Sequence, residues 1–299
     1  MGKYCDVVSS ALFYGVTWVV AMLPRWLFYG LSDVCAVLLC FVVRYRRGTV
    51  RRNLERSFPE KSARERWAIT WRFYRHLSDL FLESAFLMHA SPRRMYRRFE
   101  VENLDVFTPY YREGRSVVVA ASHYGNWEFL TLVDPLMDHK MLSIYKALHN
   151  KRIERIITRS RERMGSVAVE SRRTLRALLE YRRRGIPVLV GLITDQTPAN
   201  PYHYWCTFLN QDTVVYRGIE QIAKKFDMPV FFCNMQKPRR GCYRVRVELI
   251  TDRPRETPED WITAQHVAAL ERCIRREPAY WLWSHRRWKK KRPVELQEG

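Results

Sequence analysis

The sequence lacks the cysteine pattern of a disulfide-bonded or zinc-ribbon protein. Its seven cysteines stand far apart, are odd in number and form no C-x-x-C pair, which argues against both a disulfide framework and a zinc ribbon. Because this cysteine pattern suits free thiols, we expect the main domain to lie in a reducing compartment. A glycine-rich phosphate loop, an internal repeat and a low-complexity linker are also missing.

Acidic residues are scarce relative to basic ones. The 31 Asp and Glu stand against 52 Lys and Arg, so the formal net charge is +21. This charge favours a polyanionic partner, namely nucleic acid, an anionic membrane surface or an acidic carrier protein. The sequence shows no recognition-helix motif, zinc finger or aromatic stacking platform, which disfavours nucleic acid.

The N-terminal region is apolar and aromatic over residues 8–43, with an interruption at Pro24-Arg25, and arginines follow from Arg44 onward. This pattern is typical of a membrane-facing segment with basic residues on the cytoplasmic side. Each half is shorter than about 20 unbroken apolar residues, so a tilted span, a helical hairpin and a monotopic anchor all remain open. A helix pair packed on a soluble core is the alternative. We expect residues 1–44 to form a membrane anchor and residues 45–299 a catalytic domain.

The rest of the chain predicts an α/β fold. Ser62 and Glu65 have capping-box spacing and begin a long amphipathic helix. Asp79 and Glu83 lie beside its apolar stripe, where we expect helix-surface or charge-buffering groups without a role in the site. Short β-branched runs then alternate with helical stretches, at residues 116–121, 141–145, 167–170, 187–194, 229–234 and 243–250. Such alternation predicts a mixed, mostly parallel sheet flanked by helices, with an antiparallel pair near the end.

His123 and Glu128 form an H-x-x-x-x-E pair. The spacing alone is weak, since His266 and Glu271 share it within a helical run, where five residues place side chains about 140° apart. His123 differs because it follows the apolar strand directly, at the edge where open α/β sheets bind ligands. If His123 instead caps a helix and Glu128 offsets nearby arginines, the pair has no catalytic role.

The two side chains can meet only if the chain turns at Gly125-Asn126. Glu128 would then hydrogen-bond one imidazole nitrogen and leave the other to take a proton. We therefore predict that His123 is a general base paired with Glu128. Such a base could deprotonate a hydroxyl that attacks a thioester, without a covalent enzyme intermediate.

Other polar residues are candidates for binding substrate. Arg161 lies opposite an arginine stripe on a predicted helix, so it faces either a substrate anion or a buried ion pair. Asp195 and Gln196 close another strand and are predicted to line the same cleft or to cap a turn. Asn126 and Lys146 hold comparable turn and strand-end positions and are predicted either to contact substrate or to support the residues that do.

Five segments follow one another along the chain: His123-Tyr-Gly-Asn-Trp-Glu128, Arg161-x-x-x-Gly165, Asp195-Gln196, Phe208-Leu-Asn-Gln-Asp-Thr213 and Glu277-Pro-Ala-Tyr-Trp-Leu-Trp-Ser-His285-Arg-Arg-Trp-Lys289. In this order, over roughly residues 45–290, they resemble the late acyltransferases of lipid A biosynthesis, the lauroyl and myristoyl transferase family of Gram-negative bacteria. Residues 197–207 and Phe208-Leu-Asn depart from the family pattern. The acceptor and the acyl-chain length therefore stay open.

The resemblance implies a glycerolipid-acyltransferase-like fold and an acyl donor on acyl carrier protein. It further implies an acceptor hydroxyl on an anionic lipid A precursor, at the cytoplasmic face of the bacterial inner membrane. No metal or organic cofactor is implied. By match to the motifs, His123 and Glu128 are catalytic, Arg161 and Asp195 lie in the active site, and residues 285–287 belong to a basic surface. Acylation of another membrane lipid and a non-catalytic basic membrane- or nucleic-acid-binding role are the alternatives.

Overall fold

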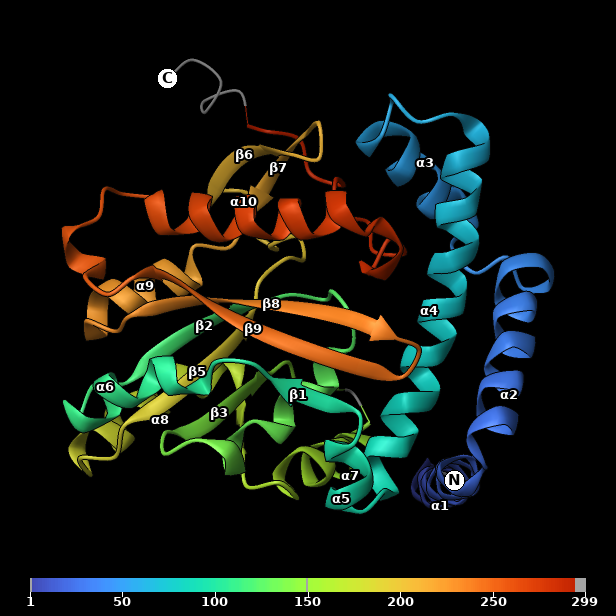
Figure 1. Ribbon diagram of the computed structural model, residues 1–299, viewed down its shortest axis with the longest axis horizontal. Helices are drawn as coiled ribbons and strands as arrows, with labels where there is room; N and C mark the ends of the chain where they lie inside the picture. Colours follow the sequence, from blue (N-terminus) through green and yellow to red (C-terminus); the bar gives the residue numbers. More distant parts are fainter. Residues whose placement is uncertain (1, 149, 294–299) are drawn as a thin grey trace.

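The computed structural model describes residues 2–148 and 150–293 and centres on a seven-stranded sheet (Figure 1). The strand order is β1-β9-β8-β2-β5-β3-β4, and every neighbouring pair is parallel except β8 with β9. The strands are β1 (Phe99–Val101), β2 (Val117–Ala121), β3 (Lys140–Tyr145), β4 (Val167–Glu170), β5 (Val188–Ile193), β8 (Val230–Arg239) and β9 (Cys242–Thr251). The predicted mixed α/β sheet and its antiparallel pair are confirmed.

A separate antiparallel hairpin of β6 (Tyr204–Phe208) and β7 (Gln211–Val215) was not predicted. The helices are α1 (Gly2–Met22), α2 (Arg25–Val37), α3 (Arg47–Ser57), α4 (Ala63–His89), α5 (Pro92–Tyr96), α6 (Thr108–Arg112), α7 (Lys151–Glu162), α8 (Thr174–Arg183), α9 (Gly218–Phe226) and α10 (Trp261–Arg276). A π-helical turn, η1 (Leu38–Val42), extends α2, and a short 3-10 helix, η3 (Trp127–Leu132), follows β2. The hairpin, α9 and α10 lie on one side of the sheet (Figure 1).

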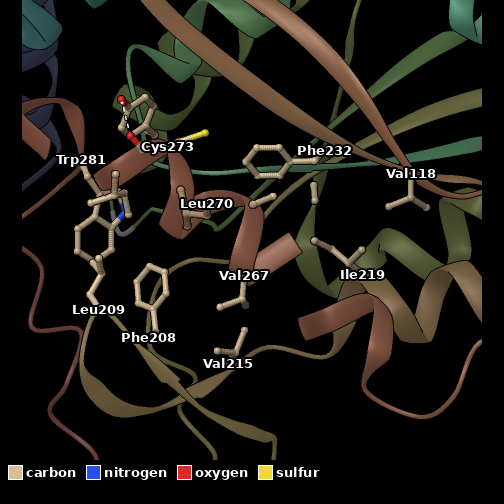
Figure 2. Packing of buried hydrophobic residues seen from close by; sticks show 14 of the residues in the cluster. Val118, Phe208, Leu209, Val215, Ile219, Phe232, Val267, Leu270, Cys273 and Trp281 are labelled. Atoms are coloured by element: carbon tan, nitrogen blue, oxygen red, sulfur yellow. Dashed lines mark hydrogen bonds between the residues drawn. The ribbon is translucent and has the colours of Figure 1, made fainter. Parts of the chain in front are cut away.

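Strand β2 lies at the centre of the sheet, between β8 and β5. All five of its side chains are buried as a result. Val118 and Ala120 join one hydrophobic cluster, while Val117, Val119 and Ala121 join another on the opposite face, as the alternation of strand side chains requires. Figure 2 shows part of the first cluster, in which Val118 of β2 lies beside Ile219 of α9, and Phe232 of β8 lies toward Leu270 of α10. A strand with two buried faces reads as a continuous apolar run, which is why the sequence identifies it.

Helix α4 stands at the carboxyl edge of the parallel strands and joins the sheet to the N-terminal helices (Figure 1). It begins at the predicted capping box, in which Ser62 and Glu65 exchange hydrogen bonds. The expectation that Asp79 and Glu83 lie on the surface of this helix is wrong, since they are 2% and 0% exposed. Their hydrogen-bond donors come from helix α2, from β8, β9 and the turn between them, and from Asn126 after β2.

The N-terminal helices pack on the domain. Tyr29 of α2 donates to Glu83, and Thr17 of α1 lies 2.9 Å from Nε2 of His89 at the end of α4. Residues Arg25–Val42 form one continuous helical stretch of 18 residues with a mean hydropathy of 1.6, which is long and apolar enough to cross a membrane. Length and composition alone do not distinguish a span from a packed helix.

Candidate active site

The register of two neighbouring strands brings His123 and Asp195 together. Parallel strands β2 and β5 pair Ala121 with Ile193, so the residues two positions beyond each strand lie opposite one another. The chain carries His123 at one of these positions and Asp195 at the other. Both therefore emerge at the carboxyl edge of the sheet, where α/β proteins place their ligands.

His123 is hydrogen-bonded to Asp195 through its ring and its backbone. Nδ1 lies 2.7 Å from Oδ1 of Asp195, and the backbone N–H of His123 donates to Oδ2 at 3.0 Å. Nε1 of Trp281 donates to the same Oδ2 at 2.9 Å. Because the carboxylate accepts at Nδ1, it favours the tautomer with a proton there and a lone pair on Nε2.

The surroundings keep Asp195 charged and His123 reachable. Burial opposes ionisation of Asp195, but the charge and hydrogen bonds of His123 and the Trp281 N–H outweigh it and lower the pKa of the carboxyl group. The Asp195 side chain is 5% exposed, whereas that of His123 is 18% exposed. Nε2 of His123 lies 3.3 Å from the amide nitrogen of Gln196. The imidazole is thus anchored on one side and accessible to a small polar group on the other.

The expected pairing of His123 with Glu128 is wrong. The Glu128 carboxylate instead takes a two-pronged hydrogen bond from Arg161, at 2.7 Å from Nη2 and 3.0 Å from Nε. A guanidinium offers a carboxylate two parallel donors, which an imidazole cannot match. Asp195 already occupies Nδ1 of His123, so Glu128 is left to helix α7.

Arg161 faces the domain, as the helical spacing predicts. Burial disfavours its charged form, but the charge and hydrogen bonds of Glu128 outweigh burial and raise the pKa of Arg161. The side chains of both residues are 21% exposed. The ion pair joins α7 to η3. It therefore holds the Arg161 guanidinium against the segment after β2 that also carries His123.

Gly125 and Asn126 form the predicted turn, but Asn126 does not contact a substrate cleft. Gly125 has a φ of +68°, which favours glycine. The Asn126 side chain is fully buried: Oδ1 caps η3 by accepting from the N–H of Glu128, and Nδ2 donates to Glu83 at 2.9 Å. Because this amide is used within the protein, the structure fits the predicted supporting role of Asn126 and not the predicted contact with substrate.

A buried polar network behind this turn holds it in place, and no local sequence pattern predicts it. His76 of α4 contacts the carbonyl oxygen of Gly125 at 3.2 Å, and Lys237 of β8 lies 3.3 Å from its other ring nitrogen. Burial, then the charge of Lys237, lowers the pKa of His76 to about 3, so the ring is neutral. Nε2 of a neutral ring would have to carry the proton to donate to the carbonyl.

Other residues predicted for the site or its surface are not part of the His123–Asp195 pair. Lys146 is exposed in the loop after β3. Arg287 was expected on a basic surface, but it is 2% exposed and donates to Thr213 and to the carbonyl of Val214. Burial lowers the pKa of Arg287 to about 10. Arg287 lines a small pocket together with Asp195. The expectation of a basic surface is therefore wrong for Arg287, whereas Arg286 is exposed.

The comparisons with known proteins point to one family. Residues 4–290 match the family described as bacterial lipid A biosynthesis acyltransferase. The chain is 25% identical over 282 residues to the lipid A biosynthesis palmitoleoyltransferase of Escherichia coli strain K12, covering 94% of this chain and 90% of that protein.

Two further relatives agree. A lipid A biosynthesis acyltransferase of Shigella flexneri shows the same identity and coverage. The lipid A biosynthesis lauroyltransferase of E. coli K12 is 22% identical over 276 residues, covering 92% of this chain and 89% of that protein. The family match spans nearly the whole chain and includes the histidine edge of the sheet. This chain therefore belongs to the bacterial lipid A biosynthesis acyltransferase family.

Proposed function

We propose that this protein transfers a fatty acyl chain from a thioester of acyl carrier protein to a hydroxyl of a lipid A precursor, at the cytoplasmic face of the bacterial inner membrane. His123 is the general base, and Asp195 rather than Glu128 orients it. The observation that carries this assignment is the 2.7 Å contact between Nδ1 of His123 and Asp195, which leaves Nε2 as the basic nitrogen.

In this reaction Nε2 of His123 takes the proton of the acceptor hydroxyl while the hydroxyl oxygen attacks the thioester carbonyl carbon. The tetrahedral intermediate then expels the thiolate of the carrier, which recovers that proton from Nε2. An ester bond forms as the thioester breaks, and no redox step occurs. The Gln196 amide, now beside Nε2, would give way to the hydroxyl or bind it. General-base assistance of this kind contributes about 10² to 10⁴ in rate.

The positive charge supports anionic substrates. Acyl carrier protein is acidic and lipid A precursors carry phosphates, so a chain with a formal charge of +21 would attract both. Arg161 uses Nε and Nη2 to hold Glu128, so its third nitrogen, Nη1, is the group that we assign to substrate. The Glu128 carboxylate keeps that guanidinium fixed, which is a positioning role.

The test is acyl transfer by the purified full-length protein in detergent, with acyl-loaded carrier and a lipid A precursor, and with the product detected by mass spectrometry. We expect His123→Ala to reduce the rate at least 10²-fold. His139→Gln is the matched control, because His139 lies just before β3, at the opposite edge of the sheet, where it contacts the carbonyl oxygen of Arg115, and it should keep wild-type turnover. An active His123→Ala protein would refute the general-base role.

Acylation of a different membrane lipid is the second candidate, because residues 197–207 depart from the family pattern. Mass spectrometry of lipids from cells lacking the protein separates the two. Lipid A one acyl chain short supports the proposed acceptor. A change confined to another lipid would overturn the acceptor while leaving the His123 chemistry standing.

A further inference from the structure

The helical stretch from α2 through η1 has its polar face turned inward. Its polar side chains bind side chains of α4 and the β8–β9 hairpin, and these pairs are Tyr29 with Glu83, Ser32 with Asp79, and Asp33 with Arg75 and Arg240. The contacts are 2.7–3.0 Å long. Hydrogen bonds of this kind fix one face of the helix to the catalytic domain.

The opposite face is apolar and exposed. Leu27 and Val34, seven residues apart on one side of the helix, are 40% and 56% exposed, and Phe41, 44% exposed, lies at the margin where this face meets α4. The exposed surface continues onto α1 at Leu12 and Trp18. The surface of a soluble monomeric protein rarely exposes so many large apolar side chains together. A patch of this kind marks contact with a membrane or another apolar partner.

The contacts along α2 show that it runs antiparallel beside α4. Tyr29 meets Glu83, Asp33 meets Arg75, and Phe41 meets Trp67 with ring centroids 5.9 Å apart. The two helices lie side by side over this whole length (Figure 1). If α2 crossed a bilayer, the charged residues of α4 beside it would have to enter the hydrocarbon, which is costly.

Charge and aromatic residues at the margins indicate what covers the apolar face. Exposed arginines lie at both ends of the stretch, which begins with Arg25 and is followed by Arg44 and Arg46. The exposed Trp26 and Tyr45 adjoin them. Arginines attract anionic lipid headgroups, and tryptophan and tyrosine prefer the membrane–water boundary. A second protein would need no such arrangement of apolar face and basic margin.

We propose that the outer face of α2–η1 lies in the plane of an anionic phospholipid surface, embedded at the level of the headgroups, and that this helical stretch does not cross the bilayer. The inference adds a membrane geometry to the proposed function but does not rest on it, since binding to lipid requires no catalysis. It also has a consequence for the site. Helix α4 holds α2 on one side and contacts Gly125 through His76 on the other, so the lipid surface and the catalytic turn share one support.

Depth measurements on the full-length protein distinguish the orientations. A spin-labelled amino acid is incorporated at position 27, 34 or 41, and the protein is bound to vesicles of phosphatidylcholine and phosphatidylglycerol. Positions 27 and 41 are fourteen helical residues apart, or about 21 Å, so a spanning helix would place position 34 well below the other two. An in-plane helix should instead give three equal, shallow depths by oxygen and nickel-chelate accessibility. A label at Glu180, exposed on α8, is the aqueous control.

A spanning helix would place position 34 near the bilayer centre and positions 27 and 41 toward opposite headgroups, which would overturn the proposal. Water-exposed labels at all three positions in the presence of vesicles would overturn it as well. The charge variant Val34→Asp should weaken vesicle binding at least tenfold, whereas Leu249→Asp, at an exposed apolar residue on β9, should not. Equal losses in both variants would contradict the assigned face. An inactive enzyme with shallow, equal depths would refute only the proposed function.

Discussion

Replacing Asp195 by asparagine removes the negative charge beside His123 and nearly preserves the shape of the side chain. The single oxygen of asparagine can still accept a hydrogen bond from Nδ1, which lies 2.7 Å from Oδ1 of Asp195, but the amide NH2 cannot accept from the His123 and Trp281 N–H groups as Oδ2 does. The main loss for catalysis is the attraction between the carboxylate and the imidazolium that forms when His123 takes a proton. Two unit charges about 4 Å apart attract by about 4 kcal/mol at an effective dielectric constant of 20, which corresponds to about 10³-fold in rate.

The assay is steady-state acyl transfer with kcat and KM measured separately. We expect Asp195→Asn to lower kcat about 10³-fold and to leave KM within a few-fold, because the lost interaction strengthens only in the transition state. Glu128→Gln is the matched control. It weakens the hydrogen bonds to Arg161 without touching the His123–Asp195 contact, so its kcat should fall less.

The same experiment can refute the reasoning. If Asp195→Asn keeps kcat within tenfold of the wild type, or if Glu128→Gln loses more than Asp195→Asn, then Asp195 does not orient the base. Thermal unfolding of both variants checks that each is folded.

Three further predictions follow from the surroundings of the site. Glu83→Ala removes the acceptor of three buried donors, so the free energy of unfolding should drop by about 3 kcal/mol or more, seen as a lower thermal midpoint; an unchanged midpoint would contradict the network. The folded state lowers the pKa of Asp195, so its stabilising effect is present above the unfolded carboxyl value of about 3.9 and is lost as the pH falls through the folded value. Acid titrations of unfolding should therefore show a shallower pH dependence in Asp195→Asn, and parallel curves would refute this. Gly125 and Gly114 both have a φ of +68°, so an alanine at either position should cost about 1–2 kcal/mol in stability. A Cβ at Gly125 would lie 2.6 Å from the sulfur of Met235, whereas a Cβ at Gly114 would meet open space. Only Gly125→Ala should therefore lower kcat.

The sequence predicts the sheet well because central strands and turns have local patterns. It misses the β6–β7 hairpin for a local reason too. The two turn residues, Leu209 and Asn210, have φ values of 50° and 62°, which the favoured Asn-Gly and Asp-Gly turns adopt easily. A leucine at the first position carries no turn signal, so the stretch reads as a loop.

The candidate site shows where local patterns stop being informative. His123 and Asp195 each stand just beyond a strand, and that much is readable. Which strand lies beside which is decided by the order of the sheet, in which β2 neighbours β5 and β8. Proximity in sequence therefore favoured Glu128, although the carboxylate that contacts His123 comes from 72 residues away. The burial of Asp79 and Glu83 was unreadable for the same reason, since their donors come from other elements.

The most direct test of the account is nitrogen NMR of the His123 imidazole in the ¹⁵N-labelled full-length protein. We predict a proton on Nδ1 and a lone pair on Nε2 in the neutral ring, with an Nδ1–H resonance that shifts in Asp195→Asn and stays in place in Glu128→Gln. A neutral ring protonated on Nε2, or an Nδ1 resonance that responds to Glu128→Gln instead of Asp195→Asn, would contradict the assignment of His123 as a base held by Asp195.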